Sequence, residues 1–473
     1  MPADGGPVQV ICPLVVHLGA TWSKDDIIVV APENRGALWK VPAAGGTLEP
    51  VTTLDTATEN SHRWPHFLPD GRHFVFTVRT VRGVTNALRI GSLDSSETTQ
   101  LAESQSNAVY ANGDLLYTKD GALLAHAFDP STRTLRGSPR AVAGGVRRNT
   151  SSAAAGFSAS ANGRLLTYLG GTHAPSRLLW FDRAGKPLAQ LGEPGTFYRV
   201  VLSHDERRVA YSTVDATRGS HDIWVADTAT GTMTRVTNHP ATDWWPVWSP
   251  DDREIVFASD RAGQSTIFKV AADGTGEPQQ VYRGDVGVMP LNWLPDGRLL
   301  FFRDVRVGES GAVLAVPVGR PAAPETVLSA SSFRINHVAQ SPDGRLLAYQ
   351  VLKPDGLEVY VAEPDGERVK ISRSGGMEPS WRRDGREVYF ATPTGDIMAV
   401  SVSPGPVFGQ PSRVMRPCEN SGAVTFRLHN ADRKSAMTAD GQRVLAVCDE
   451  VSNPPITVVL GWLAGPPAIV LSA

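Results

Sequence analysis

The chain has 473 residues, and its 46 basic residues nearly balance its 48 acidic residues, for a formal net charge of −2 at pH 7. This balance excludes the strongly basic surface that attracts nucleic acids and anionic membranes. The 45 glycines and 35 prolines are typical of many tight turns, and the hydrophobic fraction of 41% is ordinary for a globular protein.

One sequence motif recurs along the chain. It consists of two apolar or aromatic stretches joined by a turn that resembles Pro-Asp-Gly. It occurs in full at residues 64–76 (WPHFLPDGRHFVF) and again at residues 245–257 (WPVWSPDDREIVF). Proline presets the backbone angle at the first corner of such a turn, aspartate can bond the nearby backbone, and glycine accepts the left-handed conformation. Each copy therefore predicts a β-hairpin with short, alternating strands.

The turns repeat at intervals of 41 to 56 residues. Their last residues are Asp26, Gly71, Gly113, Gly163, Glu206, Asp252, Gly297, Gly344, Gly385 and Gly441. A period of roughly 40 to 45 residues matches the four-stranded blade of a β-propeller, whereas leucine-rich, ankyrin and tetratricopeptide repeats are shorter. The pattern predicts an all-β protein of about ten four-stranded blades, with almost no helix.

The three cysteines, Cys12, Cys418 and Cys448, are too few and too scattered for a disulfide framework or a zinc site. Cys418 and Cys448 could pair in an oxidising compartment if one blade brings them together. We expect instead that they are small buried residues. We also expect no metal and no cofactor.

The repeated motif resembles the repeats of TolB-like, WD-type propellers. Their characteristic sequence is Pro-x-Trp/Phe-Ser-Pro-Asp-Gly, followed by a strand that contains Phe or Tyr. Residues 246–251 (PVWSPD) and 379–385 (PSWRRDG) carry this likeness, which extends over nearly the whole chain. The resemblance implies a propeller fold. It implies little about function, because propellers carry many unrelated activities.

A second resemblance is to the propeller region that follows the membrane segment of certain bacterial serine/threonine protein kinases. It rests on residues 19–26, 61–72, 106–110 and 454–460. In that family a kinase domain and a transmembrane helix precede the repeats, and neither occurs in this sequence. The only near-match to a kinase catalytic loop is His62-Arg63-Trp64, where Trp64 replaces the catalytic Asp.

The kinase-linked family also suggests how the blades are grouped, since propellers usually have 4 to 8 blades. We expect a tandem β-propeller, with an N-terminal partial propeller of about four blades at residues 1–175. A six-bladed TolB-like ring would follow at residues 176–465, with a tail at 466–473. The four-blade part could close as a small ring, stay open with exposed strand edges or pair with a neighbour, and a truncated N-terminus is also compatible with this count.

The best candidates for a binding surface are the residues that enter the innermost strand of each blade, because these surround the mouth of the channel. They are Arg63, Trp64, Tyr198, Arg199, Asp243, Trp244, Trp245, Met289, His337 and Glu378. This mixed set is not a ring of metal ligands, so we assign no catalytic and no metal-binding residue. Neighbouring strand residues face opposite ways, so we expect one of Trp244 and Trp245 to pack between blades and the other to face a partner. The competing interpretation, that both pack, stays open.

These features predict a non-enzymatic propeller that binds a protein or peptide partner or senses a ligand, as the sensor or interaction part of a kinase-linked signalling protein. The alternatives are a propeller enzyme with a channel-centred site and a gating propeller of a separate hydrolase of the prolyl oligopeptidase class. The Gly-x-Ser-x-Gly motif of such hydrolases is matched only poorly, at residues 308–312 (GESGA).

The sequence also gives an expectation for the cellular compartment of the protein. Its first residues lack the positive region of a secretory signal, and no stretch has about 20 uninterrupted apolar residues. We therefore expect no membrane insertion by this chain. As written, the chain would be cytoplasmic, or extracytoplasmic or periplasmic if it is a fragment of a membrane kinase.

Overall fold

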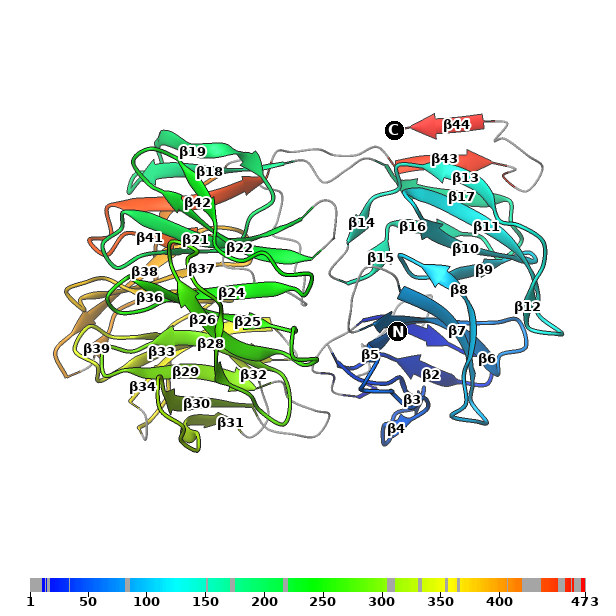
Figure 1. Ribbon diagram of the computed structural model, residues 1–473, viewed down its shortest axis with the longest axis horizontal. Coiled ribbons are helices and arrows are strands. Elements are labelled where there is room, and N and C mark those ends of the chain that lie inside the picture. Colours follow the sequence, from blue (N-terminus) through cyan, green and yellow to red (C-terminus); the bar gives the residue numbers. More distant parts are fainter. Residues whose placement is uncertain are drawn as a thin grey trace. The chain divides into compact units, whose positions relative to one another are not determined.

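The computed structural model of the protein describes residues 11–12, 14, 18–33, 35–80, 86–149, 152–170, 175–215, 220–303, 311–330, 334–353, 356–363, 366–405, 407–418, 435–449, 456–460, 462 and 469–472. The chain divides into two compact units (Figure 1). Unit 1 contains Met1–His173 and Ser452–Ala473, and unit 2 contains Ala174–Val451. The predicted all-β class is confirmed, since antiparallel strands make up the sheets of both units. Within the described residues, no helix is both long enough and apolar enough to cross a bilayer.

The described part of unit 1 contains four sheets and a two-stranded ribbon. The first sheet has β1 (Ala20–Trp22), β2 (Ile27–Val30), β3 (Trp39–Pro42) and β4 (Glu49–Pro50). The second has β5 (Glu59–Phe67), β6 (His73–Thr80), β7 (Asn86–Ser92) and β8 (Thr99–Ser104). The third has β9 (Val109–Ala111), β10 (Asp114–Lys119), β11 (Ala122–Asp129), β12 (Thr134–Leu135) and β13 (Arg140–Gly144). The ribbon of β14 (Arg148–Asn149) and β15 (Ala154–Ala155) precedes a fourth sheet of β16 (Phe157–Ala159), β17 (Leu165–Leu169), β43 (Ile456–Leu460) and β44 (Ile469–Ser472).

The described part of unit 2 contains six sheets. One sheet combines β18 (Ser176–Asp182) and β19 (Pro187–Gly195) with β41 (Ser435–Met437) and β42 (Arg443–Asp449). The next two are β20 (Tyr198–Leu202), β21 (Arg208–Val214), β22 (His221–Asp227) and β23 (Met233–Arg235), then β24 (Asp243–Trp248), β25 (Glu254–Ser259), β26 (Thr266–Ala271) and β27 (Gln279–Tyr282). Two more are β28 (Val288–Trp293), β29 (Arg298–Arg303), β30 (Gly311–Pro317) and β31 (Glu325–Ala330), then β32 (Arg334–Gln340), β33 (Leu347–Lys353), β34 (Gly356–Ala362) and β35 (Val369–Lys370). The last has β36 (Met377–Trp381), β37 (Glu387–Ala391), β38 (Ile397–Ser403), β39 (Val407–Phe408) and β40 (Ser412–Met415).

The repeated turns join the first and second strands of these sheets, as the sequence predicts. In the turn before β33, the amide of Gly344 donates to the Ser341 carbonyl over 2.9 Å, and the Ser341 hydroxyl donates to Asp343 over 2.5 Å. Gly344 has a φ of 77°, a conformation that glycine adopts without steric cost. The turn chemistry inferred from the repeats is therefore present in the folded chain.

Hydrophobic clusters connect the sheets of unit 2 one after another. Each pair of sheets that are neighbours in sequence shares a cluster of buried side chains, and the sheet of β36–β40 shares one with the sheet of β18 and β42. The sheet of β18 and β42 shares a further cluster with the sheet of β20–β23. The series of shared clusters therefore leads back to the sheet at which it began. The first strands also touch in order, from β41 to β20, β24, β28, β32 and β36. We call the region where these first strands meet the hub.

The last strands of the chain lie where the sequence did not predict them. β43 pairs with β17, and β44 pairs with β43, so both belong to unit 1 (Figure 1). The expected extension of the six-bladed part to residue 465 and the expected tail at 466–473 are therefore corrected. The physical reason is burial, because β43 places Val459 in a core with Leu166 of β17, and Trp462 joins the same core.

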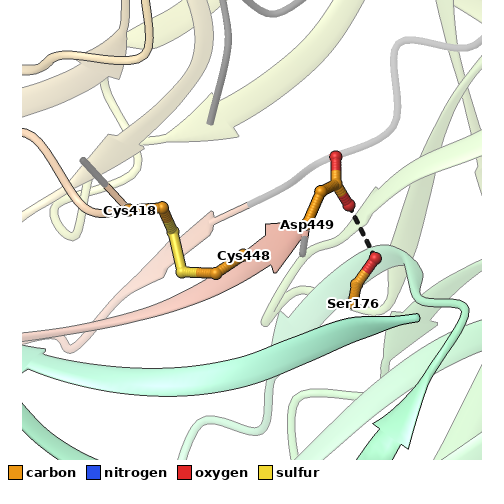
Figure 2. Close-up of a disulfide and its surroundings, with 4 residues drawn as sticks. All are labelled: Ser176, Cys418, Cys448 and Asp449. Atoms are coloured by element: carbon orange, nitrogen blue, oxygen red, sulfur yellow. Dashed lines mark hydrogen bonds between the residues drawn. A yellow bond between two sulfur atoms is a disulfide. The ribbon is translucent and has the colours of Figure 1, made fainter. Parts of the chain in front are cut away.

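The expectation that Cys418 and Cys448 are separate buried residues is wrong. They form a disulfide with their Cα atoms 5.4 Å apart (Figure 2). Cys448 lies on β42 and Cys418 follows β40, so the bond joins two neighbouring sheets of unit 2. Beside it, the Ser176 hydroxyl of β18 donates to Asp449 over 2.6 Å.

Candidate functional site

The first strands of several sheets share a backbone irregularity at the predicted binding residues. The pairing register of β20, β24, β32 and β36 with the next strand shifts within the first half of each strand. At each shift one non-glycine residue has a positive φ, and these are Arg199 (46°), Trp245 (63°), His337 (45°) and Glu378 (56°). A β-bulge redirects side chains and interrupts the regular in-and-out alternation. Left-handed backbone at such residues costs about 1 to 2 kcal/mol each, so the surrounding packing must hold them there.

Three of these side chains meet in the hub of unit 2, although they come from three different sheets. The guanidinium carbon of Arg199 lies 4.6 Å from the centre of the Trp245 ring. The Nη1 atom of Arg199 is 3.2 Å from Nδ1 of His337, and the Trp245 and His337 rings are 5.9 Å apart. Arg199 and His337 are each only 5% exposed. We call these three residues the hub cluster.

The chemistry of the hub cluster follows from its donors. A guanidinium has no acceptor atom, so Arg199 donates to Nδ1 of His337, which leaves the proton of that imidazole on Nε2. The face of an indole attracts a cation, which stabilises the positive charge of Arg199 beside Trp245. The indole N–H of Trp245 is buried and meets no acceptor within the described residues. A buried donor of this kind usually has a partner.

Trp244 and Trp245 are both half-buried, and both pack against the core between the sheets of β28–β31 and β32–β35. Trp245 also contacts the Phe302 ring, at 5.6 Å between ring centres. Each tryptophan therefore combines packing with partial exposure. The expected division into one packing and one partner-facing tryptophan stays a prediction.

Other predicted binding residues of unit 2 have structural partners. Asp243 is fully buried and accepts two hydrogen bonds from Arg261, at 2.8 and 3.0 Å. Arg261 in turn lies over the Phe257 and Phe268 rings. This arrangement makes Asp243 an anchor for the start of β24.

The remaining predicted residues of unit 2 contact their own sheet or the next one. The Tyr198 and His221 rings are 4.8 Å apart, and the Ser265 hydroxyl lies 3.5 Å from the Met289 sulfur. The Glu378 amide donates to Gln350 over 3.1 Å. The Glu378 carboxylate is also 3.5 Å from the hydroxyl of Ser435.

Arg63 and Trp64 do not belong to the hub cluster, because they lie on β5 of unit 1. Trp64 has a positive φ of 54° at a register shift, as in the strands of unit 2. Its indole N–H donates to the Ser152 carbonyl over 2.7 Å. Arg63 Nε donates to the Ser61 hydroxyl over 2.8 Å. Eight of the ten residues predicted from sequence therefore lie in unit 2, and two lie in unit 1.

Sequence reasoning missed a buried polar network in unit 1. Glu59 accepts from Arg89 over 2.6 Å and lies 3.0 Å from Nε2 of His62, whose Nδ1 is 2.8 Å from the Thr52 hydroxyl. Burial by itself raises the pKa of Glu59, but its hydrogen bonds and the nearby positive charges lower that pKa below its usual value overall. The Thr52 hydroxyl also accepts from the Leu38 amide over 2.9 Å. The network joins β5 and β7 to the residues that flank β3 and β4, and its parts are too far apart in sequence to form a recognisable motif.

A pocket of about 470 Å³ opens between the β18–β19 hairpin and the turn from β22 to β23. Its wall includes Trp180 and Met233, with the turn residues around Gly192 and Gly231. Within the part of the chain that the structure describes, no group of three or more His, Cys, Asp and Glu side chains could hold a metal ion.

Comparisons with known proteins agree with the propeller prediction. Residues 158–331 match the family model of the TolB beta propeller domain, so the predicted TolB-like propeller domain is confirmed there. The chain is 31% identical over 113 residues to the protein named "Uncharacterized peptidase YuxL" of Bacillus subtilis (strain 168), a match that covers 23% of this chain and 17% of the relative. It is 37% identical over 60 residues to the Tol-Pal system protein TolB of Wolinella succinogenes, covering 13% of this chain and 14% of that protein. The chain therefore matches less than a fifth of the length of either curated relative.

Among solved structures, the putative TolB from Agrobacterium tumefaciens is similar at 16% identity and a TM-score of 0.46, over 59% of this chain and 99% of that chain. TolB from Acinetobacter baumannii is similar at 13% identity and a TM-score of 0.38, over 66% of this chain and 82% of that chain.

Proposed function

We propose that unit 2 is a closed six-bladed β-propeller that binds a protein or peptide partner at its hub and catalyses no reaction. The circuit of shared hydrophobic clusters supports a closed ring. The match of residues 158–331 to the TolB beta propeller domain supports the family of the fold. Unit 1 would be a smaller propeller of about four blades that remains open.

The observation that carries the binding role is the hub cluster. It places a buried positive charge, on Arg199, next to the buried indole N–H of Trp245, which meets no acceptor within the described residues. Arginine and tryptophan are the residue types that most often dominate the energy of protein interfaces. A partner that presents a carboxylate or a backbone carbonyl would accept from the Trp245 indole N–H beside the positive charge of Arg199. We therefore propose an extended peptide segment with an acidic side chain or a free C-terminus as the occupant.

The disulfide supports a location outside the cytoplasm, because disulfides persist mainly in oxidising compartments. Such a location suits the resemblance to the propeller region of membrane-linked serine/threonine kinases. We propose that the chain acts as the extracytoplasmic sensor or interaction part of a signalling protein of this kind.

The test is quantitative capture of partners by the immobilised full chain from an extracytoplasmic fraction. We expect Arg199→Gln and Trp245→Ala to lose the partner that the wild-type chain retains. Trp22→Ala is the matched control, because Trp22 is an exposed tryptophan of unit 1. Circular dichroism would show that each variant is folded. Equal capture by the folded hub variants and the wild-type chain would reject the hub as the binding site.

A second candidate is a propeller that accompanies a separate peptidase. It is favoured by the 31% identity to the Bacillus subtilis protein named as a peptidase. If it is correct, the captured proteins include a serine hydrolase that a fluorophosphonate probe labels. Peptide hydrolysis by the purified chain alone would instead favour a channel-centred enzyme.

A further inference from the structure

The pocket of about 470 Å³ in unit 2 has walls from two neighbouring sheets. One wall is built largely by β19, and the other by the turn that joins β22 to β23. We call it the hairpin pocket. Its volume lies within the range of about 300 to 1,000 Å³ that is usual for small-molecule sites. It is distinct from the hub, because none of the residues of the hub cluster lines it.

Two glycines let the walls of the hairpin pocket approach each other closely. A Cβ atom added to Gly231 would lie 3.2 Å from the amide nitrogen of Gly192, and one added to Gly192 would overlap the end of the Met233 side chain. Both glycines have a positive φ, 66° for Gly192 and 72° for Gly231, which glycine adopts without steric cost. The backbone of the two walls is therefore in close contact, and this contact shapes the pocket in the absence of a ligand.

The apolar part of the pocket belongs to the core of unit 2. Leu191 and Trp180 are buried in the cluster that joins this sheet to the sheet of β20–β23, and Met233 packs against that cluster. The guanidinium carbon of Arg443 lies 4.9 Å from the centre of the Trp180 ring, so this indole already interacts with a cation. The pocket therefore offers an apolar surface next to a positive charge that would repel a second cation.

Two threonine hydroxyls of the wall use their protons within the protein. Thr228 donates to the Glu206 carbonyl over 2.9 Å, and Thr230 donates to the Asp227 carboxylate over 3.0 Å. A hydroxyl has one proton but two lone pairs. Both hydroxyl oxygens can therefore still accept a hydrogen bond from a ligand.

The wall from β19 adds an amide and a carboxylate. The Gln190 amide nitrogen donates to the Gly192 carbonyl over 2.8 Å, which holds the amide in place and leaves its carbonyl oxygen as an acceptor. Glu193 is exposed and supplies a carboxylate, which only accepts. Of the described residues that line the pocket, none is lysine, arginine or histidine. The wall therefore favours a ligand that donates hydrogen bonds, and it offers no positive charge to an anion.

We infer that the hairpin pocket binds a neutral saccharide. An anion would meet no positive charge in the wall, and a cation would be opposed by Arg443 beside Trp180. A saccharide carries no charge, and its hydroxyl groups can donate to Gln190, Glu193 and the threonine oxygens. Its C–H groups can pack on the apolar surface, as small-molecule sites combine apolar contacts with a few placed polar groups. The inference does not rest on the function proposed for the hub.

The test is saturation-transfer NMR of the full chain with maltose, cellobiose and N,N′-diacetylchitobiose as separate probes, followed by calorimetric titration of each probe that binds. We expect at least one of the three to bind. Gln190→Ala should weaken that binding by about twofold to tenfold, as expected for the loss of one neutral hydrogen bond. Gln279→Ala is the matched control, because Gln279 is an exposed glutamine on β27, the outermost strand of another sheet of unit 2. It lies outside the pocket wall and should leave the affinity unchanged.

A steric variant tests the location of the site. Ala229 is an exposed residue of the pocket wall, so Ala229→Trp should fill the pocket and abolish binding, whereas Ala229→Ser should retain it. Circular dichroism would show that each variant is folded. Trp245→Ala should still bind the saccharide, so the result is independent of the hub.

Two charged probes test the class of ligand. Spermidine and sodium acetate should neither bind in the pocket nor displace the saccharide. Displacement by either probe, or binding of either probe that Ala229→Trp abolishes, would overturn the assignment to a neutral ligand. The inference is also overturned if none of the three saccharides binds, or if one binds the folded Gln190→Ala and Ala229→Trp variants with wild-type affinity.

Discussion

In both units one sheet is completed by a strand from late in the chain, and we call it the completed sheet. The two units differ in what packs against this completed sheet. In each unit a strand from before residue 183 pairs antiparallel with a strand from after residue 442, which gives the pairs β17–β43 in unit 1 and β18–β42 in unit 2. The sheet of unit 2 shares hydrophobic clusters with the sheets before and after it. In unit 1 one face of the completed sheet packs against β9–β13. The opposite face carries the exposed side chains of Leu165, Leu169, Ile456 and Leu460.

Pairing between strands that are distant in sequence is therefore not enough to bury both faces of the sheet that they complete. Pairing β17 with β43 satisfies backbone hydrogen bonds, but it buries only one face of the sheet. Unit 2 gains its second face because a further sheet, β36–β40, lies beside the completed one. The hydrophobic contacts between sheets, rather than the pairing within a sheet, therefore distinguish the two units.

The largest expected effect comes from the buried face of the completed sheet in unit 1. Trp462 is fully buried against Leu166 and Val459, and replacing such a tryptophan by alanine costs about 3 to 5 kcal/mol. Trp462→Ala should therefore lower the unfolding temperature of unit 1 and leave unit 2 unchanged in differential scanning calorimetry. Ile456→Ala is the control, because Ile456 lies on the exposed face and should cost far less. Equal losses for the two variants would show that both faces are covered.

The disulfide should stabilise only unit 2. Cys418 and Cys448 are 30 residues apart in sequence, and a crosslink over a loop of this size contributes about 3 to 4 kcal/mol to the free energy of unfolding. Cys418→Ala with Cys448→Ala should lower the unfolding temperature of unit 2, as should a reducing agent. Cys12→Ala, in unit 1, is the control for removal of a thiol. A matching loss in unit 1 would mean that the two units do not unfold separately.

Alanine substitutions at two glycines in equivalent turns test how tightly the sheet of β18, β19, β41 and β42 packs against its neighbour. Gly344 and Gly441 have similar positive φ values, 77° and 71°, so alanine at either position carries the same backbone cost. At Gly441 the new methyl group would also overlap the hydroxyl of buried Tyr389, whereas Gly344 has no close neighbour. Gly441→Ala should therefore lose about 1 to 3 kcal/mol more stability than Gly344→Ala, measured by urea denaturation. Equal losses would indicate that Tyr389 moves aside without cost.

The smallest effect concerns a partly exposed ion pair of unit 2. Burial by itself raises the pKa of Glu358, but the hydrogen bonds from Lys353, Lys370 and Tyr360 together lower it to about 2. Because the folded pKa lies below the unfolded value of about 4.3, this contribution is present above the unfolded pKa and is lost as the pH falls through 2. Glu358→Gln should cost no more than about 1 kcal/mol at pH 7. Denaturation of both proteins from pH 7 to pH 2.5 should show this difference shrinking, and a constant difference would contradict the ion-pair explanation.

The local β-structure of this protein is predictable from its residues alone. The turn at Gly344 and its equivalents form hairpins because proline, aspartate, serine and glycine restrict only the few residues of each turn. The candidate residues could also be named from sequence, since Arg199, Trp245 and His337 enter first strands as expected.

Which of these residues meet, and which strands complete each sheet, depends on how the sheets pack in the folded chain. The bulges that redirect Arg199, Trp245 and His337 break the period of two from which strand faces are predicted. The pairing of β17 with β43 and the bond between Cys418 and Cys448 join segments that are distant in sequence. Such contacts depend on the burial of shared apolar surface between sheets, and no local pattern of residues encodes that burial.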